Sequence, residues 1–327
     1  MKIGKLTIAD LENLIFKNIK NSRKEVMVSP EIGGDCAAID LGEKVVYLST
    51  DPITGSNNGI GKLAININCN DIATQGVSPL GLMITILAPP NTEKEEIAKI
   101  MEEIQEECTK LNVSILGGHT EITAAVNKIV ISATSIGIGE KKDYRRKEEV
   151  VEGDKLVITK GVGIEGIGII SYEKEEELKE ILSIDELESA KGFLDKTTVV
   201  KDGIIGGKYS KGMHDVTEGG LLGAIWETSR FYNLGSKINY EVLPIEGFSK
   251  KICDFYKIDI LRLISSGTML MVVSENNIEK LKEELNKENI KMFVIGELTK
   301  NKENILIKNN KEIKIEEPES DELYKVI

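Results

Sequence analysis

The sequence predicts an α/β protein, because strand-like and helix-like patterns alternate along it. Two apolar, β-rich runs of strand length occur at 44–49 (KVVYLS) and 80–88 (LGLMITILA). A strongly amphipathic helix is predicted next, over 93–111. The chain has 327 residues, twice the usual domain length of about 150, so we expect two domains.

The first α/β unit is built around the helix at 93–111. Thr92 and Glu95 are predicted to form a capping box at its start. Two more strands, at 113–116 and 128–136, complete the unit. The apolar side chains that recur at helical spacing and face the sheet are Ile97, Ile100, Met101, Ile104, Cys108 and Leu111.

A charged, turn-like stretch at 140–154 (EKKDYRRKEEVVEGD) follows this unit. We therefore predict a first domain at 1–148 and a second at 149–327. The second domain again alternates strands with helices, which makes it α/β as well. Its predicted strands are 155–160, 268–273 and 292–295, its predicted helices lie near 164–182, 219–229 and 277–285, and a polar tail follows.

Composition excludes several classes of protein. Lys and Arg number 42 against 54 Asp and Glu, a net charge of −12, and aromatic residues are only 5%. Nucleic acid is not an expected partner, because its binding needs a basic surface and stacking side chains. No run of about 18 apolar residues occurs, so we expect no membrane span. The four cysteines are far apart in sequence, which favours a reduced, cytoplasmic protein.

The helix predicted over 59–76 (GIGKLAININCNDIATQG) has an unusual polar face. Asn and Asp lower helix propensity, and a solvated face would normally carry Glu and Lys instead. We therefore expect this face to meet a polar ligand; the alternatives are a buried polar network or an early helix end at Asn70. The apolar stripe is Ile60, Leu63, Ala64 and Ile67, and the polar residues are Lys62, Asn66, Asn68, Asn70 and Asp71.

Two further acids stand in loop-like settings. Asp35 lies in GGDCAA, where small neighbours allow close approach of the backbone, and Asp51 directly follows the strand KVVYLS. Together with Asp71 they could hold Mg²⁺, which takes oxygen ligands and commonly shares carboxylates with substrate phosphates. For each acid alone, a turn cap is the simpler interpretation.

Both histidines of the chain lie in glycine motifs. His119 occurs in Gly117-Gly118-His119-Thr120-Glu121 and His214 in MHDVTEGG at 213–220. Backbone amides in a Gly-Gly turn or at a helix N-terminus can bind an anion. Each histidine could serve as a catalytic or ligand residue, or only form a hydrogen bond within its turn.

Two glycine-rich segments resemble nucleotide-binding motifs without meeting their requirements. Gly161 to Gly166 matches G-x-G-x-x-G, but a charged helix follows where a dinucleotide site needs a second strand ending in an acid. We assign these glycines to a tight turn or a helix–sheet contact, and a nicotinamide oxidoreductase is a weaker alternative. The segment 55–63 (GSNNGIGKL) has the wrong glycine spacing for a Walker A loop.

Seven motifs occur in an order that resembles the aminoimidazole ribonucleotide (AIR) synthetase superfamily. This superfamily also includes thiamine monophosphate kinase, selenophosphate synthetase and the hydrogenase maturation factor HypE, and the likeness is greatest to HypE-like proteins. The motifs are GGDCAAI, STDPI, IGKLAININCNDIATQGVSP, ILGGHTE, ITKGVGIEG, HDVTEGGLLGAIWE and LISSGTML.

The resemblance implies two α/β domains, with the first forming a β-barrel across a homodimer and ATP bound between the domains. It further implies phosphorylation of an amide, carbamoyl or similar oxygen of a small-molecule or protein-borne substrate. The residues that match functional positions are Asp35, Asp51 and Asp71 for Mg²⁺; Lys62, Asn70, Gly117, Gly118, Thr120 and Lys160 for ATP; and His119, Asp215, Thr217 and Glu218 for catalysis.

Two departures from the HypE pattern leave the acceptor open. His119 stands where the superfamily usually has Asp or Glu, and Glu121 is a candidate replacement. HypE proteins carry a C-terminal cysteine, whereas the last cysteine here is Cys253, so carbamoyl transfer to the chain's own tail is not expected. The alternatives are a catalytically idle nucleotide-binding partner of a maturation enzyme and a kinase like thiamine monophosphate kinase. Selenophosphate synthetase fits less well, because no cysteine lies in the N-terminal arm.

Overall fold

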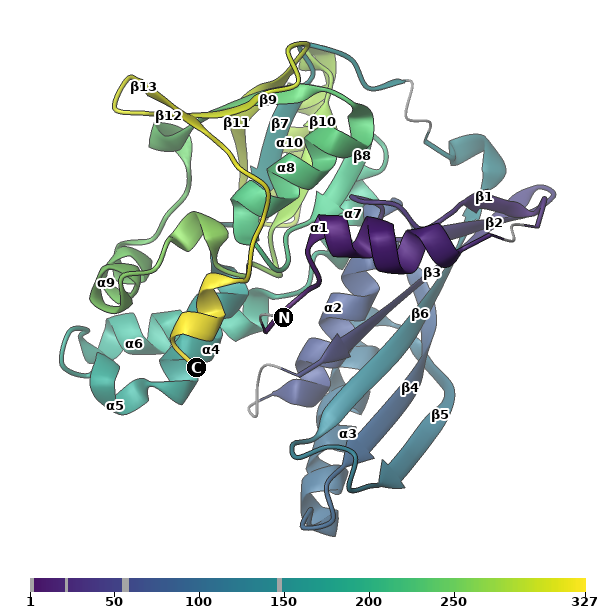
Figure 1. Cartoon of the computed structure of the whole chain (residues 1–327), viewed down its shortest axis with the longest axis vertical. Coiled ribbons are helices and arrows are strands. Elements are labelled where there is room, and N and C mark those ends of the chain that lie inside the picture. The colour runs from purple at the N-terminus through teal and green to yellow at the C-terminus, as the bar shows by residue number, and fades with distance from the viewer. Residues whose placement is uncertain (1–2, 21–22, 55–58, 146–148) are drawn as a thin grey trace.

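The computed structural model describes residues 3–20, 23–54, 59–145 and 149–327, and it contains two β-sheets with helices packed on them (Figure 1). The first sheet ends at Glu140 and the second begins at Lys155, on either side of the predicted domain boundary. The boundary at 148 and the first four residues of the segment 55–63 lie outside the described residues. The α/β class is confirmed.

The first sheet has six strands in the order β1-β2-β3-β6-β4-β5, and only β4 and β5 pair in parallel. Helix α2 packs against β3 and β6, and α3 packs on α2. The strands are β1 (Val26–Val28), β2 (Ala37–Leu41), β3 (Lys44–Ile53), β4 (Pro79–Ala88), β5 (Ser114–Ile122) and β6 (Val130–Glu140), and the helices are α1 (Ile8–Asp10), α2 (Ile60–Thr74) and α3 (Lys94–Leu111).

The second sheet has seven strands in the order β13-β12-β9-β11-β7-β10-β8, with β9 and β12 parallel. Its strands are β7 (Lys155–Thr159), β8 (Ser210–Asp215), β9 (Gly235–Asn239), β10 (Met269–Val273), β11 (Met292–Thr299), β12 (Asn304–Lys308) and β13 (Lys311–Lys314). Its helices are α4 (Ile164–Glu173), α5 (Glu175–Leu178), α6 (Ile184–Lys191), α7 (Val200–Gly206), α8 (Gly220–Tyr232), α9 (Gly247–Tyr256) and α10 (Ile278–Lys287). No helix among the described residues is long and apolar enough to cross a membrane.

Several predicted boundaries were wrong. The capping box of α3 uses Glu93 and Glu96, one residue later than predicted. The predicted polar tail contains the strands β12 and β13. Both strands are short and carry few apolar residues, so the sequence pattern did not indicate them. The helix predicted near 164–182 is interrupted at Lys174, which divides it into α4 and α5.

Helix α2 lies between the two domains (Figure 1). Every residue of the helix except Lys62 is buried, so its asparagines and Asp71 meet protein and not solvent. Its Leu63 and the Ile158 of β7 belong to one continuous hydrophobic core. The asparagines of α2 must therefore find hydrogen-bond partners inside the protein.

The asparagines form hydrogen bonds with groups of both domains, most of them backbone groups. Asn70 Nδ2 donates to the carbonyl of Thr197 at 2.8 Å, and Asn70 Oδ1 accepts from the amide of Val199 at 2.7 Å. Asn66 Nδ2 donates to the Thr197 hydroxyl at 3.1 Å. Asn68 Oδ1 accepts from the backbone N–H of Asp51 at 2.9 Å. This is the buried polar network that the sequence left as the alternative to a ligand-facing surface.

Replacing Asn70 should weaken the contact between the domains. Asn70→Ala leaves a buried carbonyl and a buried amide without partners, and each costs about 1–3 kcal/mol. We expect the free energy of unfolding in urea to fall by about 2–5 kcal/mol. The exposed Asn286→Ala is the control and should change it by less than about 0.5 kcal/mol. Equal stability of the two variants would contradict this role for Asn70.

Candidate acid cluster between the domains

Four aspartates from separate elements meet beside α2. Asp71 lies on α2 and accepts a hydrogen bond from the Ser49 hydroxyl of β3. Asp51 lies further along β3, within the strand and not after it as predicted, because it pairs with Ala133 of β6. Asp35 precedes β2, and Asp215 ends β8. The aspartates singled out in the sequence are thus brought together, and Asp215 joins them.

The charges of these aspartates act on one another. Burial raises the pKa of Asp71 well above its usual value, and repulsion from Asp215, Asp51 and Asp35 adds to the rise. Burial likewise raises the pKa of Asp215 to about 7, and Asp35 contributes to this shift. Burial also raises the pKa of Asp51, although Lys5 opposes it. Ionising all four carboxylates together therefore requires compensating positive charge, part of which Lys5 and His214 supply.

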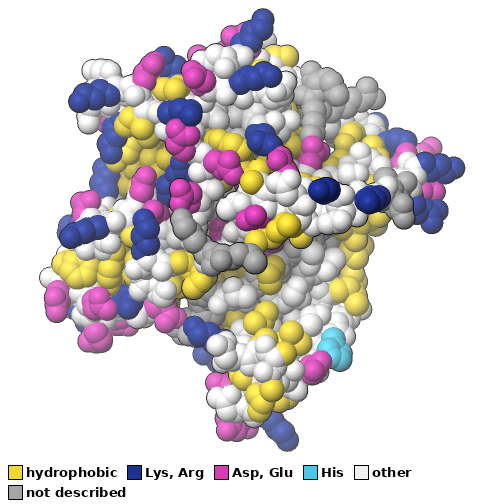
Figure 2. All heavy atoms as spheres, viewed as in Figure 1, with side chains coloured by type: hydrophobic (Ala, Val, Ile, Leu, Met, Phe, Trp, Pro, Cys, Tyr) yellow, Lys and Arg dark blue, Asp and Glu magenta, His cyan; other side chains and the backbone are white. Residues whose placement is uncertain are grey.

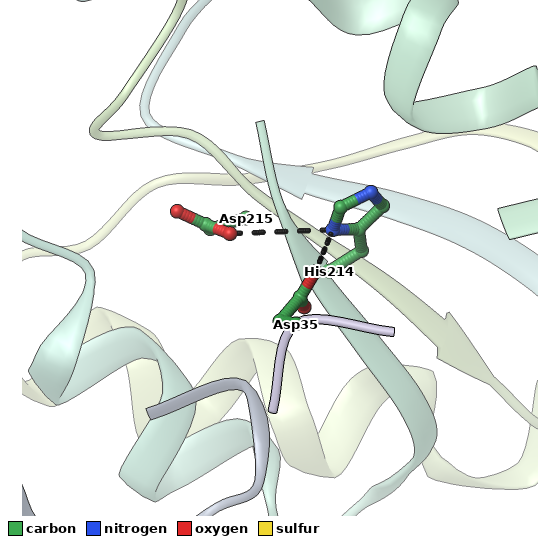
Figure 3. A group of neighbouring side chains, drawn as sticks. All are labelled: Asp35, His214 and Asp215. Atoms are coloured by element: carbon green, nitrogen blue, oxygen red, sulfur yellow. Dashed lines mark ion pairs between the residues drawn. The ribbon is translucent and has the colours of Figure 1, made fainter. Parts of the chain in front are cut away.

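His214 joins the cluster to α8. Its Nδ1 lies 2.7 Å from Asp35 Oδ1 and 4.0 Å from Asp215 Oδ1, and Figure 3 shows both contacts meeting at this nitrogen. Its Nε2 lies 3.0 Å from Glu227 Oε2. Desolvation lowers the pKa of His214, but Asp35 and Glu227 outweigh it and raise that pKa well above 6.5. His214 therefore orients Asp35 from a fixed ring.

The donor set of the cluster suits a hard divalent cation. One ligand atom each from Asp35, His214 and Asp215 lies within 4.8 Å of the others. Asp215 Oδ2 is buried and has no hydrogen-bond partner. With Asp51 and Asp71 alongside, most of the available donors are carboxylate oxygens, which Mg²⁺ prefers. The residues present therefore fit the magnesium ion that the resemblance implies.

Lys5 is a component of the cluster that the sequence did not indicate. Desolvation lowers the pKa of Lys5, but attraction to Glu227, Glu218, Asp51 and Asp215 outweighs it and raises that pKa. The residue as a whole is exposed. Nothing local in MKIGKLT signals this role, because only the folded chain brings its N-terminal arm to the acids.

The N-terminal arm is held by a distant segment, residues 316–327. The Ser320 hydroxyl donates to the carbonyl of Ile3 at 2.9 Å. Gly4 packs against the ring of Tyr324, where an added Cβ would lie 3.1 Å from ring carbon Cε2. Figure 1 shows this C-terminal segment beside the start of the chain.

The predicted nucleotide ligands Lys62, Asn70 and Lys160 are engaged elsewhere. Lys62 forms ion pairs with Asp195 and Glu107. Lys160 Nζ lies 2.6 Å from Asp202 Oδ1 and donates to the Thr198 carbonyl at 3.0 Å. Asn70 is bound to the backbone of the second domain, as described above. The partners of Lys62 and Asn70 include groups of the second domain, whereas those of Lys160 lie within its own domain.

The predicted Gly-Gly loop is part of an edge strand. Gly117, Gly118, His119 and Thr120 all lie in β5, whose residues are exposed throughout. Gly118 has φ +156°, and a Cβ there would lie 1.8 Å from the Ile84 carbonyl oxygen, so only glycine permits this approach of β5 to β4. His119 Nε2 lies 3.4 Å from Glu121 Oε2.

Strand register separates this edge from the acids of the same chain. Asp51 pairs with Ala133, Ala133 with Ile84, and Ile84 with Gly118. Three strand spacings of about 4.8 Å place Gly118 about 14 Å from Asp51. One chain therefore does not bring the predicted catalytic His119 or the glycines to the acid cluster.

The predicted catalytic residues of the second domain lie in the turn between β8 and α8. Asp215 belongs to the acid cluster, and Thr217 lies in the turn that leads to α8, where its carbonyl accepts from Gly220 N at 3.1 Å. Glu218 Oε1 accepts a hydrogen bond from Tyr324 at 2.9 Å. Asp321 accepts from the amide of Gly219 at 2.7 Å. The segment 316–327 therefore contacts this turn directly.

The G-x-G-x-x-G segment shapes the start of α4. A Cβ on Gly166 would lie 2.4 Å from Leu263 Cγ, which shows close packing of the helix on its neighbour. Ser265 Oγ accepts from the amides of Gly163 and Ile164 at 2.7 and 3.2 Å, so these amides are not free for a phosphate. The glycines were predicted to serve a tight turn or a helix–sheet contact, and Gly166 packs instead against Leu263, which follows the short turn Ile260–Arg262.

The fold and the site define a two-sheet α/β protein with a buried acid cluster between its domains. A family model for the N-terminal domain of AIR synthase related proteins matches residues 33–139, and the model for the C-terminal domain matches 151–309. The chain therefore belongs to the AIR synthase related protein family, which confirms the resemblance seen in the sequence.

The relatives in this family are named for different activities. The chain is 27% identical, over 93% of its length and 91% of the relative, to a putative hydrogenase expression/formation protein of Methanocaldococcus jannaschii. It is 24% identical to the carbamoyl dehydratase HypE of Escherichia coli, over 71% of this chain and 67% of that protein. It is also 24% identical to the thiamine-monophosphate kinase of Buchnera aphidicola, over 92% and 94%.

Solved structures share the fold. AaThiL complexed with AMPPCP and TMP aligns with a TM-score of 0.75 at 21% identity, covering 96% of each chain. The hydrogenase maturation protein HypE in complex with ATP aligns with a TM-score of 0.70 at 16% identity, covering 98% of this chain and 94% of that one.

A buried carboxyl outside the acid cluster, Glu165 of α4, should make stability depend on pH. Burial raises the pKa of Glu165 from 4.5 to about 7; Ser266 opposes the rise, and Asp321 and Glu218 add to it. Between these pH values the folded state retains a proton that the unfolded state has lost, so stability falls as pH rises. Relative to Glu165→Gln, the wild type should lose about 3 kcal/mol between pH 4 and pH 8.

Urea unfolding of both proteins at the two pH values measures this loss. Because the other titrating groups are common to both proteins, the change in their difference reports on Glu165. A difference in unfolding free energy that is the same at pH 4 and pH 8 would contradict the pKa shift.

Proposed function

We propose that this protein is an ATP- and Mg²⁺-dependent enzyme that phosphorylates an amide, carbamoyl or similar oxygen of its substrate. The single observation that carries the proposal is the convergence of Asp35, Asp51, Asp71 and Asp215 at one buried place. Their mutual repulsion is unfavourable for folding, which indicates that a bound cation offsets it in the working protein.

The four aspartates would hold the magnesium ion. Bound there, the ion would neutralise charge on the phosphates of ATP. His214 acts as a positioning residue, because its contacts with Asp35 and Glu227 fix the carboxylate's direction. Lys5 adds a positive charge at the side of the cluster that faces Asp51 and Glu218.

The relatives support nucleotide as the second component. HypE has been solved in complex with ATP and AaThiL with AMPPCP, and both share the two-sheet fold. In the proposed reaction the substrate's carbonyl oxygen attacks the γ-phosphorus, the bond to the β-phosphate oxygen breaks, and ADP leaves with the electron pair. The phosphorylated oxygen is then a good leaving group. Thr217 and Glu218 lie on the acceptor side, next to the acids.

Removal of the aspartate charges should abolish metal-dependent ATP binding. In the triple variant Asp35→Asn, Asp51→Asn and Asp71→Asn, neutral amides replace the proposed ligands. We expect the Mg²⁺-dependent part of ATP affinity, measured by isothermal titration with and without Mg²⁺, to fall at least 10-fold, about 1.4 kcal/mol.

Asp185→Asn, an exposed aspartate of α6, is the matched control and should bind as the wild type does. Thermal unfolding of the triple variant shows whether it is folded, and relief of repulsion should keep it at least as stable as the wild type. If a folded triple variant bound ATP with unchanged Mg²⁺-dependent affinity, the result would contradict the proposal.

We further propose that the site is completed in a homodimer. β5 is an exposed edge strand, and apolar side chains lie beside it: Leu80 and Met83 on β4 and Ile138 on β6 are all exposed. Figure 2 shows apolar side chains along this flank of the molecule. An uncovered apolar sheet surface with a free edge favours association with a second sheet. A second copy would bring its own Gly117 to Thr120 and His119 toward the acids.

A charge on this sheet should separate the dimer. Met83→Glu places a carboxylate on the surface proposed to be covered, whereas Met101→Glu places one on α3, away from the sheet edge. We expect light scattering after size exclusion to show a dimer for wild type and Met101→Glu and a monomer for Met83→Glu. ATP affinity should fall with the dimer. A wild-type monomer that binds ATP would contradict the shared site.

A second candidate is a small-molecule kinase. It is favoured by the match to thiamine-monophosphate kinase, which covers more of both proteins than the match to Escherichia coli HypE does. A screen of ADP release with amides, carbamoyl compounds and thiamine monophosphate separates the two. Nucleotide binding without turnover on any of them would instead favour the idle partner.

A further inference from the structure

His214 has two ring nitrogens, and each faces a different part of the site. Nδ1 lies 2.7 Å from Asp35 Oδ1 and 4.0 Å from Asp215 Oδ1. Nε2 lies 3.0 Å from Glu227 Oε2. Figure 3 shows Nδ1 on the side of the ring that faces both aspartates, and the other nitrogen turned away from them. The ring therefore joins the acids to α8 through opposite edges.

The side chains around Nδ1 are buried. Those of His214, Asp35 and Asp215 are 9%, 8% and 2% exposed. Asp215 Oδ2 has no hydrogen-bond partner, and Lys5 acts on Asp215 only through its charge. A buried carboxylate oxygen without a partner is unfavourable. An imidazolium at His214 pairs with Asp35 and Glu227 but leaves this oxygen alone.

The three donor atoms are spaced like the ligands of one metal ion. One atom each from Asp35, His214 and Asp215 lies within 4.8 Å of the other two. Around an octahedral ion with bonds of roughly 2.1 Å, neighbouring ligands lie about 3 Å apart and opposite ligands about 4.2 Å apart. The separations of 2.7 and 4.0 Å from Nδ1 are close to these two values. A cation shared by these atoms therefore requires little movement of the side chains.

Glu227 holds the ring of His214 in the way that a metal-bound histidine is usually held. A histidine that binds a metal through one nitrogen almost always donates its other N–H to a carboxylate, a carbonyl or water, which fixes the tautomer. When Nε2–H is donated to Glu227, the lone pair of Nδ1 faces the acids. The loop that carries Asp35 packs directly on α8, because a Cβ on Gly33 would lie 2.8 Å from the Glu227 carbonyl oxygen. One helix thus positions both the ring and this loop.

A nitrogen ligand changes which cation the site prefers. Mg²⁺ prefers oxygen ligands, whereas imidazole suits the first-row transition metals. Zinc, for example, is held in proteins by imidazole nitrogen and carboxylate oxygen together. A site built from carboxylates alone would lack this preference. His214 is therefore the residue that sets the selectivity of the site.

We propose that Asp35, His214 and Asp215 bind a first-row transition-metal dication, with His214 Nδ1 as one of its ligands. The inference rests on the proposed function, which places a cation among these acids, and it deepens it by naming the class of cation. Asp51 and Asp71, which offer only oxygen, remain for the Mg²⁺ that accompanies ATP. Glu227 is a positioning residue that acts through His214.

The test measures metal binding to the full chain without nucleotide. Every protein carries His119→Gln, so His214 is its only histidine and an imidazole ligand has a single source. Isothermal titration gives the affinities for Co²⁺ and Mg²⁺, the visible spectrum of Co²⁺ reports on its ligands, and ¹⁵N NMR follows the ring nitrogens as Zn²⁺ is added. We expect Co²⁺ to bind at least 10-fold more tightly than Mg²⁺, and Zn²⁺ to shift the Nδ1 signal.

His214→Gln removes the nitrogen ligand from this parent protein. The affinity for Co²⁺ should fall at least 10-fold, while the affinity for Mg²⁺ stays within about threefold because the carboxylates are unchanged. Glu227→Gln keeps an acceptor oxygen but removes its charge, so the affinity for Co²⁺ should fall about 10-fold. Glu279→Gln, an exposed residue of α10, is the matched control and should bind both metals as the parent does.

Equal losses of Co²⁺ and Mg²⁺ affinity in His214→Gln would overturn the assignment, because a residue that only orients Asp35 affects both cations. An unshifted Nδ1 signal at saturating Zn²⁺, or a parent that does not bind Co²⁺, would overturn it as well. If His214→Gln does not fold, the NMR measurement on the parent decides by itself. Failure of the proposed function gives a different result, namely no Mg²⁺-dependent ATP binding while Co²⁺ still binds without nucleotide.

Discussion

The structure depends on the convergence of four aspartates at the contact between two domains, where burial raises the pKa of Asp51, Asp71 and Asp215. Asp71 is fixed on α2, which is enclosed on all sides, and Asp51 is fixed by its strand and by Asn68. Burial disfavours the charged form of both side chains, and repulsion from neighbouring acids adds to this effect. Hydrogen bonds such as those of Asn70 to the second domain hold the arrangement together. The free-energy cost of bringing these acids together is thus offset in part by the neutral hydrogen bonds beside them.

Both chain ends converge on this region. The N-terminal arm brings Lys5 to the acids, and the segment 316–327 holds that arm and contacts the turn at Glu218. Loops and chain ends are the parts of a protein that open at low cost in free energy.

The sequence predicted the elements best where their pattern is local. Strand β3 and helix α3 follow directly from an apolar run and from apolar residues at helical spacing. Gly117 and Gly118 were expected in a loop because paired glycines usually mark turns. They lie in β5 instead, where Gly118 approaches the carbonyl of Ile84 more closely than any side chain would permit. That contact joins residues far apart in the chain, so no local pattern reports it.

The sequence by itself determined the candidate residues: the aspartates, the HDVTEGG turn and their order along the chain. Only the tertiary structure decided what each of them faces. Asn70 and Lys62 were predicted to bind nucleotide, and the second domain supplies partners for both. Lys5 and Glu165 gave no local signal at all. The reason is physical: helix and strand patterns depend on neighbours a few residues away, whereas the compensation of a buried charge depends on whichever groups folding places beside it.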